Sequence, residues 1–249
     1  MGPIFSIDVG ATGTKAAIVD SKKGILLTER IKYPTPNLAE PDQIIEIILQ
    51  LKKDLGYDGS ISGMGFPSII KNGKSWTANN ISDSFIGYHL QIKYSKALGM
   101  PLYVLNDADA AGMAEMEFGA IKNKKGKVIL LTLGTGIGSA FFFNGELIPN
   151  LELGSMKYRS GKTEDYAANS ARERKELSWK QWGKELNKVL AYYELVFTPE
   201  LFVIGGGVSK KLSKYSKYLN PAAKIIPATF LNEAGIIGPA IYAAKLHGK

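Results

Sequence analysis

Two short turns, far apart in the chain, combine residue types that bind anions. The first places an acid at the end of an apolar stretch and follows it with glycines, hydroxyls and a cation: Asp8, Gly10, Thr12, Gly13, Thr14 and Lys15. The second has glycines at alternate positions: Gly134, Thr135, Gly136 and Gly138. Glycines let backbone N–H groups approach a phosphate closely. The first turn alone fits an ordinary β-hairpin equally well. In the second, alternate glycines are costly for a strand, so close approach by a ligand is the simplest explanation. The pair together favours a phosphate clamp.

A third polar cluster, Asn106-Asp107-Ala108-Asp109, follows another apolar stretch. The carboxyl ends of strands are the usual place for ligand sites in α/β sheets, and Asp107 is the candidate general base there. An Asn or Asp at the same junction would also serve as a helix N-cap, and the residues alone leave these two interpretations even. Phosphoryl transfer to a hydroxyl needs a positioned carboxylate, phosphate-binding amides and a metal ion.

Composition limits the rest of the chemistry. The 249 residues contain no Cys and two His, which excludes thiol catalysis, disulfides and Cys-ligated zinc, so a catalytic metal would need oxygen ligands. The net charge of +8 favours anionic partners such as nucleic acid, anionic lipid or a polyanionic substrate, although plain solubility explains it as well. Asp8 interrupts the apolar N-terminal stretch before it could act as a signal peptide or membrane span, so we expect a cytoplasmic protein without a membrane partner.

Short β-branched runs alternate with helical patterns, which indicates an α/β protein. We expect strands at 4–9, 15–19, 24–31, 61–66, 102–105, 128–133, 139–143 and 201–204. We expect helices at 41–55, 84–98, 108–118, 163–174, 178–197 and 232–246. The strand, glycine turn and strand that open the chain start again near residue 128. This repetition predicts two related lobes around a cleft, one formed by residues 1–108 and 236–249 and the other by 109–235.

Several motifs together resemble the ROK family of sugar kinases, and in particular its polyphosphate-dependent branch. They are DVGATGTK (8–15), GFP (65–67), TANNI (77–81), NDADAAG (106–112), LTLGTGIGSA (131–140), PNLELG (149–154) and ARERKELSW (171–179). The resemblance spans the chain in the right order. It implies the two-lobed actin-like ATPase or hexokinase (ribonuclease H-like) fold, usually as a homodimer.

The resemblance also implies roles for single residues. Asp107 would be the general base toward a sugar 6-hydroxyl, and the sugar-binding residues would be Gly65, Asn80, Asn106, Asp107, Glu152, Ser155 and Glu164. The two glycine turns, together with Gly206, would face the phosphoryl donor. Asp8 would approach Mg²⁺ through water, because Mg²⁺ retains much of its hydration shell.

Three positions depart from the family pattern. Ser155 stands where the family motif Glu-x-Gly-His has a histidine, Ala11 replaces a turn glycine, and Ser68 replaces a glycine after the GFP motif. Loss of this sugar-binding imidazole would weaken the free energy of sugar binding by about 1–3 kcal/mol if the imidazole's partner stayed buried and unpaired. These changes put sugar identity and turnover in question more than the class of reaction.

The implied reaction is phosphoryl transfer from inorganic polyphosphate to the 6-hydroxyl of glucose or a related hexose. ATP stays possible as a further donor, because the glycine turn at 205–207 suits a nucleotide. Polyphosphate needs an extended basic surface. Candidates are the run Lys122, Lys124, Lys125 and Lys127 and the group Lys157, Arg159, Lys162, Arg172, Arg174 and Lys175, although a solvated basic face is an equal interpretation.

Three other functions stay open at this point. The chain could be a strictly ATP-dependent hexokinase, a catalytically impaired protein that binds sugar or polyanion, or a nucleic-acid-binding regulator. Regulators of this broad family carry an added helix-turn-helix domain, for which the strand beginning at Ile4 leaves no room, so we expect no specific nucleic-acid partner.

Overall fold

The computed structural model describes residues 2–78, 81–231 and 233–248. The chain divides into two compact units: unit 1 comprises residues 1–117 and 233–249, and unit 2 comprises residues 118–232. The sequence prediction drew the boundaries at 108/109 and 235/236. The observed division assigns the whole of α3 (Asp107–Glu117) to unit 1, because α3 packs along α7 (Ala234–His247). None of the helices among the described residues is long and apolar enough to cross a membrane.

Unit 1 is built on a mixed sheet with the order β3-β2-β1-β5-β8, in which β4 also pairs with β2. Its strands are β1 (Ile4–Gly10), β2 (Gly13–Asp20), β3 (Ile25–Leu26), β4 (Ile31–Tyr33), β5 (Ser62–Phe66) and β8 (Leu102–Asn106). A separate hairpin consists of β6 (Ile70–Lys71) and β7 (Lys74–Ser75). Because β1, β5 and β8 run parallel, their carboxyl ends meet at one edge of the sheet.

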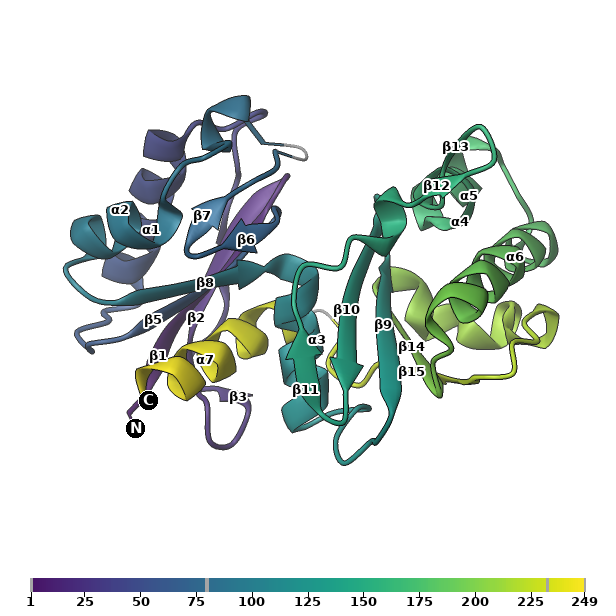
Figure 1. Ribbon diagram of the computed structural model, residues 1–249. Coiled ribbons are helices and arrows are strands. Elements are labelled where there is room, and N and C mark those ends of the chain that lie inside the picture. The colour runs from purple at the N-terminus through teal and green to yellow at the C-terminus, as the bar shows by residue number, and fades with distance from the viewer. Residues whose placement is uncertain (1, 79–80, 232, 249) are drawn as a thin grey trace. The chain divides into compact units, whose positions relative to one another are not determined.

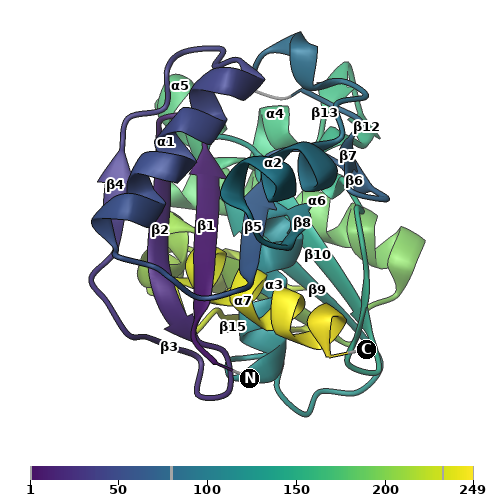
Figure 2. The same ribbon diagram turned by 90° about the vertical axis from the view of Figure 1, so that its left-hand side faces the viewer.

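Helices cover both faces of this sheet, as Figures 1 and 2 show. Helices α1 (Pro41–Asp54) and α2 (Leu90–Leu98) bury apolar side chains against Phe5, Ile7 and Val9 of β1. Helix α7 packs on the opposite face, against Ile4. The alternation along β1 therefore follows the two-residue period of a strand.

Unit 2 repeats this sheet order. Its order, β11-β10-β9-β14-β15, has the same pattern of antiparallel and parallel neighbours as β4-β2-β1-β5-β8. The strands are β9 (Lys127–Leu133), β10 (Ile137–Phe143), β11 (Glu146–Ile148), β14 (Leu201–Gly205) and β15 (Lys224–Pro227), with a small hairpin of β12 (Lys157–Tyr158) and β13 (Gly161–Lys162). The predicted repetition of the opening motif is confirmed at the level of sheet topology.

One long helix, α6 (Trp179–Phe197), supplies much of the core of unit 2. A capping box at Ser178 and Gln181 begins it, and Trp182, Leu186 and Leu190 pack against strands β9 and β14. The remaining helices are short: α4 (Glu164–Ala167), α5 (Asn169–Arg174) and the 3₁₀ helices η2 (Leu153–Ser155), η3 (Gly207–Lys214) and η4 (Ser216–Tyr218).

Three predicted elements differ from the structure. The strand expected at 24–31 consists of the short β3 and β4, because Thr28 Oγ1 accepts the N–H of Ile18 in place of a backbone carbonyl. The helix expected at 84–98 is the 3₁₀ turn η1 (Asp83–Phe85) followed by α2, since Gly87 between them has φ = +80°. The helix expected at 163–174 is divided at Ala168, whose backbone is extended.

Candidate active site

The polar residues of unit 1 gather at the carboxyl edge of its parallel strands. The register pairs Asp8 with Gly65, Gly65 with Leu105 and Phe66 with Asn106. Two strand spacings of about 4.8 Å separate β1 from β8, so Asp8 and the Asn106-Asp107 pair belong to the same end of the sheet. A Cβ built on Gly65 would lie 3.3 Å from the Cβ of Ala110, a tight contact, and 3.7 Å from the Cα of Asp107, so Gly65 packs directly against the start of α3.

The structure shows which residue of the Asn106-Asp107 junction caps the following helix. Asn106 is the helix cap, because its Oδ1 accepts the N–H groups of Ala108 at 2.8 Å and Asp109 at 3.1 Å. Its Nδ2 donates to the carbonyl of Ser68 at 3.2 Å, so Asn106 is buried and fixed. Asp107 is exposed, and its Oδ1 accepts the N–H of Ala108 at 2.8 Å. The capping function therefore belongs to Asn106, and the Asp107 carboxylate remains accessible to a ligand.

Ser68 anchors the segment that leads to the predicted sugar loop. Its hydroxyl lies 2.6 Å from Ser75 Oγ and 2.7 Å from the carbonyl of Thr77. A glycine at this position would lack both contacts. Asn80, predicted to bind sugar, lies outside the described residues.

The first glycine turn is a two-residue connection, Ala11-Thr12, between β1 and β2, closed by the Gly10–Gly13 pair. Thr12 is exposed, but Thr14 is fully buried and its hydroxyl lies 3.0 Å from Thr35 Oγ1. The side chain of Thr14 is thus used inside the fold, which corrects its prediction as a donor-binding hydroxyl.

The charges beside this turn form a row across three strands. Asp8 on β1 is paired with Lys15 on β2, and Lys15 is paired with Lys32 on β4, so the three side chains share one face. Lys15 Nζ lies 2.8 Å from Asp8 Oδ2, and the two charges offset each other. Lys32 was not predicted as a site residue, yet its side chain crosses the turn so closely that a Cβ on Gly13 would overlap its Cε.

The second turn connects β9 to β10, and its hydrogen bonds orient it. Gly134 N–H donates to the carbonyl of Gly136 at 3.0 Å. The carbonyls of Gly134 and Thr135 accept from the backbone and hydroxyl of Ser170, at 3.0 and 2.5 Å. Within the described parts of the chain, the N–H groups of Thr135 and Gly136 have no hydrogen-bond partner. Two adjacent amides are therefore available to an anion.

The predicted sugar-binding acids of unit 2 lie at the end of this turn. Glu164 Oε2 accepts the N–H of Ile137 at 3.3 Å, and a Cβ on Gly136 would lie 2.5 Å from the same oxygen. Gly154, two residues after Glu152, packs so closely on Ile137 that a Cβ there would overlap its carbonyl. Burial and the nearby Glu164 carboxylate raise the pKa of Glu152, while Lys162 opposes the shift.

Two buried residues that were not predicted tie these acids together. Thr163 Oγ1 donates to the carbonyls of Leu153 and Gly154 at 2.6 and 2.9 Å, and Tyr193 Oη donates to the carbonyl of Leu153 at 2.8 Å. Because Thr163 immediately precedes Glu164, this network fixes the Glu152 loop to the Glu164 helix. The signal for this network in the sequence is weak, since it consists only of a hydroxyl residue, Thr163, directly before an acid.

The other predicted residues occupy less specific surroundings. Ser155 is exposed at the end of η2. Gly138 pairs with Thr132 inside the β9–β10 ladder. Gly206 has φ = +78°, and a Cβ there would lie 2.8 Å from the carbonyl oxygen of Leu133, so local packing already explains this glycine.

No group of three or more His, Cys, Asp or Glu side chains among the described residues is placed to hold a metal ion. Asp8 offers one carboxylate that is shared with Lys15. This donor set fits a Mg²⁺ ion that arrives on substrate phosphates, since such an ion needs only one or two protein carboxylates.

Comparisons with known proteins identify relatives of this chain. Residues 4–151 match the model of the ROK family. The polyphosphate glucokinase of Mycobacterium tuberculosis is 40% identical over 238 residues, which cover 95% of this chain and 89% of that protein. The crystal structure of an inorganic polyphosphate/ATP-glucomannokinase from Arthrobacter sp. strain KM matches with a TM-score of 0.93 and 42% identity, covering 99% of this chain and 100% of that one.

A ROK family glucokinase from Streptomyces griseus, crystallised with glucose and AMPPNP, matches with a TM-score of 0.83 over 98% of this chain and 100% of its own, at 22% identity. That similarity supports the fold. The predicted fold class is confirmed: the two mixed sheets are those of the actin-like ATPase fold of sugar kinases. With its family model matched over more than half its length, the chain belongs to the ROK family.

Proposed function

We propose that this protein transfers a phosphoryl group from inorganic polyphosphate to the 6-hydroxyl of glucose or a related hexose, and that ATP is a second donor. The observation that carries this proposal is the 40% identity, over 95% of the chain, to a protein named polyphosphate glucokinase. The named activity of the Arthrobacter protein, which has both polyphosphate and ATP in its name, supports the choice of donors.

On the acceptor side, Asp107 accepts the proton of the sugar hydroxyl as the phosphoryl group is transferred. Asn106 holds the backbone beside it through the helix cap and also binds sugar, as does Asn80. Glu152 and Glu164 accept hydrogen bonds from ring hydroxyls, because carboxylates form charge-assisted bonds to such groups. Ser155 stands at the histidine position of the family motif and contributes a weaker, water-mediated contact.

On the donor side, the free N–H groups of Thr135 and Gly136 bind phosphate oxygens. The first turn contributes Gly10, Thr12 and Gly13. Lys15 is partly neutralised by Asp8, so Lys32 supplies the second cation. Mg²⁺ bound to the donor, with Asp8 approaching it through water, would offset charge on the phosphate oxygens.

One experiment tests the activity. Purified protein is incubated with Mg²⁺, a panel of hexoses and either polyphosphate or ATP, and the sugar phosphate is identified by mass. A product from ATP alone would replace the proposal with an ATP-dependent hexokinase. Hexose binding without product, even in a single turnover with labelled donor, would support a sugar-binding protein instead.

A substitution tests the assigned base. Asp107→Asn is expected to retain hexose binding and to lower kcat by about 10²- to 10⁴-fold, the usual contribution of a general base. Asp58→Asn, which changes an exposed acid elsewhere on unit 1, is the matched control and should leave kcat unchanged. Equal turnover of the Asp107 variant and the unsubstituted protein would refute the assignment.

Light scattering tests the further proposal that the protein is a homodimer.

A further inference from the structure

The net charge of the protein belongs almost entirely to unit 2. Residues 118–232 contain 18 Lys and Arg against 9 Asp and Glu, a formal charge of +9. Unit 1 contains 13 basic and 14 acidic residues, a charge of −1. A flexible polyanion is attracted to a surface of this kind, with an affinity that falls as salt is added.

Within unit 2, two cations converge on one half-buried aromatic ring. The guanidinium carbon of Arg172, on α5, lies 4.4 Å from the centre of the Trp179 ring, and Lys211 Nζ, on η3, lies 5.7 Å from it. Tyr215 stacks on Trp179 with ring centres 5.7 Å apart and planes 16° from parallel. We call Arg172, Trp179, Lys211 and Tyr215 the Trp179 cluster. Its two cations lie within about 10 Å of each other.

Both segments that carry these cations start at the second glycine turn. Helix α5 is joined to the turn through Ser170, which bonds the carbonyls of Gly134 and Thr135. The η3 helix follows Gly206, which lies against the backbone of Leu133 directly before the turn. A chain of phosphates whose end is bound by the turn amides can therefore continue toward the cluster.

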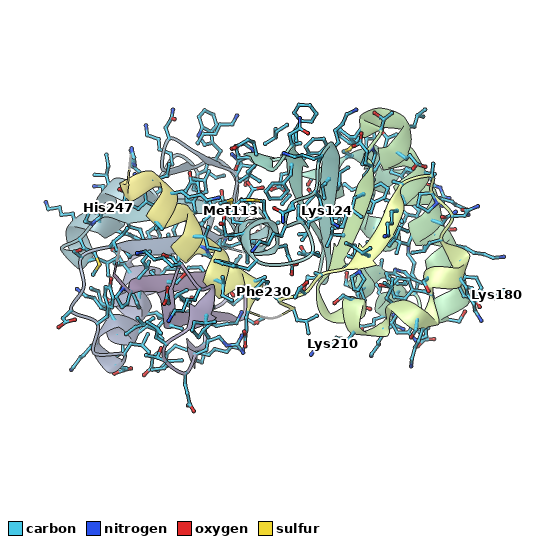
Figure 3. The ribbon with its side chains drawn as sticks, turned by 90° about the horizontal axis from the view of Figure 1, so that it is seen from below. Met113, Lys124, Lys180, Lys210, Phe230 and His247 are labelled. Carbon is cyan, nitrogen blue, oxygen red and sulfur yellow. The ribbon has the colours of Figure 1, made fainter. Side chains whose placement is uncertain are left out.

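Positive charge remains at the cluster after its ion pairs are counted. Arg172 Nη2 lies 3.1 Å from Glu173 Oε1, but the Glu173 side chain is 62% exposed, so water screens the pair. Lys211 forms no ion pair with any residue that the structure describes. Figure 3 shows the neighbouring lysines Lys180 and Lys210 extending from the surface of the same unit.

We propose that Arg172 and Lys211, positioned by Trp179, bind phosphates of the polyphosphate chain beyond the one that is transferred. This inference rests on the proposed function, and it assigns the part of the donor site that a long polyphosphate uses and ATP does not. Arginine suits such a position because its planar donors match phosphate oxygens, and the contact with an aromatic ring limits the side-chain entropy lost on binding.

The test compares donors in the double variant Arg172→Gln/Lys211→Gln. The KM for long-chain polyphosphate is expected to rise about 10- to 100-fold, while the KM for ATP changes less than about twofold. Log affinity falls as log salt rises, and the magnitude of this slope should decrease by about 2, one unit per lost phosphate contact. The control Lys184→Gln/Lys224→Gln removes two exposed lysines of the same unit and should change neither donor's KM by more than about twofold.

A second variant should change the KM for long polyphosphate in the opposite direction. Glu173→Gln removes the carboxylate beside Arg172 and is expected to lower the KM for long polyphosphate, without changing the KM for ATP. Equal KM values for long polyphosphate in the double variant and the unsubstituted protein would overturn the proposal, as would equal losses in the double variant and its control.

Direct binding separates this inference from the proposed function. Titration calorimetry with long-chain polyphosphate needs no turnover, so loss of binding in the double variant supports the cluster even if no sugar phosphate forms. A single-stranded oligonucleotide is the competitor. If it binds the unsubstituted protein as tightly as polyphosphate does at equal salt, and loses affinity equally in the double variant, the cluster is a nucleic-acid site and our assignment is wrong.

Discussion

The substitution Gly134→Ala separates a turn that binds phosphate from a turn that is glycine-rich for structural reasons. A Cβ at Gly134 meets no atom within 4 Å, and the backbone there does not have a positive φ. The fold alone therefore accepts alanine, and reduced freedom of the unfolded chain would stabilise the variant by about 0.4–1 kcal/mol. Its melting temperature should stay equal or rise slightly.

A bound phosphate changes that expectation. The methyl group would lie in open space one residue before the unbonded N–H groups of Thr135 and Gly136, and there it would hold a phosphate away from them. A hydrogen bond to a charged group contributes about 1.5–3 kcal/mol, so losing one such bond raises the donor KM about 10- to 150-fold. The hexose KM should change less than about twofold, because no atom of Glu164 lies within 4 Å of a Cβ at Gly134.

The assay combines thermal unfolding with initial rates at varied donor and varied hexose. Gly136→Ala is the companion variant, since its Cβ would lie 2.5 Å from Glu164 Oε2 and would displace the carboxylate from Ile137 N–H. That variant should raise both the donor KM and the hexose KM. A Gly134→Ala protein with unchanged stability and unchanged donor KM would refute the phosphate-binding role of this turn.

Three further predictions concern other parts of the molecule. Because the pKa of Glu152 is raised, its ionised form opposes folding at neutral pH. Glu152→Gln should therefore raise the Tm at pH 7, by an amount that shrinks as the pH falls through that pKa. The hexose affinity of the same variant, measured by calorimetry, should decrease. Lys32→Met should raise the donor KM about tenfold and leave the hexose KM unchanged, as initial rates would show. Gly13→Ala, which forces the same lysine aside, should also raise the donor KM. Gly238→Ala should destabilise the protein by at least about 2–3 kcal/mol in urea unfolding, because its Cβ would overlap the carbonyl of Ala110 where α7 meets α3.

The sequence predicted the strands and long helices well because their signals are local. The two-residue alternation of β1 and the capping residues of α6 lie within a few positions of the elements they specify. The prediction of one helix over residues 163–174 was wrong at Ala168 because of a tertiary contact. Trp182 Nε1 donates to the carbonyls of Ala167 and Ala168, and the chain bends there although its residues favour one continuous helix.

The candidate site divides in the same way. The predictions of Asp107 and the two turns rest on residue types next to strand ends. Which of Asn106 and Asp107 caps α3 depends instead on the Ser68 carbonyl, 38 residues earlier. Lys32 was missed because the predicted strand ended at residue 31, one position before it. Only the register of β4 against β2 shows that this lysine reaches the turn.

The discontinuity of unit 1 has a consequence for biosynthesis. Helix α7 forms part of this unit, and it packs so closely on β5 that a Cβ on Gly63 would overlap the carbonyl of Pro239. The ribosome makes α7 only after all of unit 2, which is continuous in the chain and can fold first. Until α7 emerges, Ile4 and Ile61 lack the helix that covers them, so the nascent chain carries an exposed apolar face for as long as the ribosome takes to translate unit 2. During that interval the unfinished first unit is the part of the chain most in need of a chaperone.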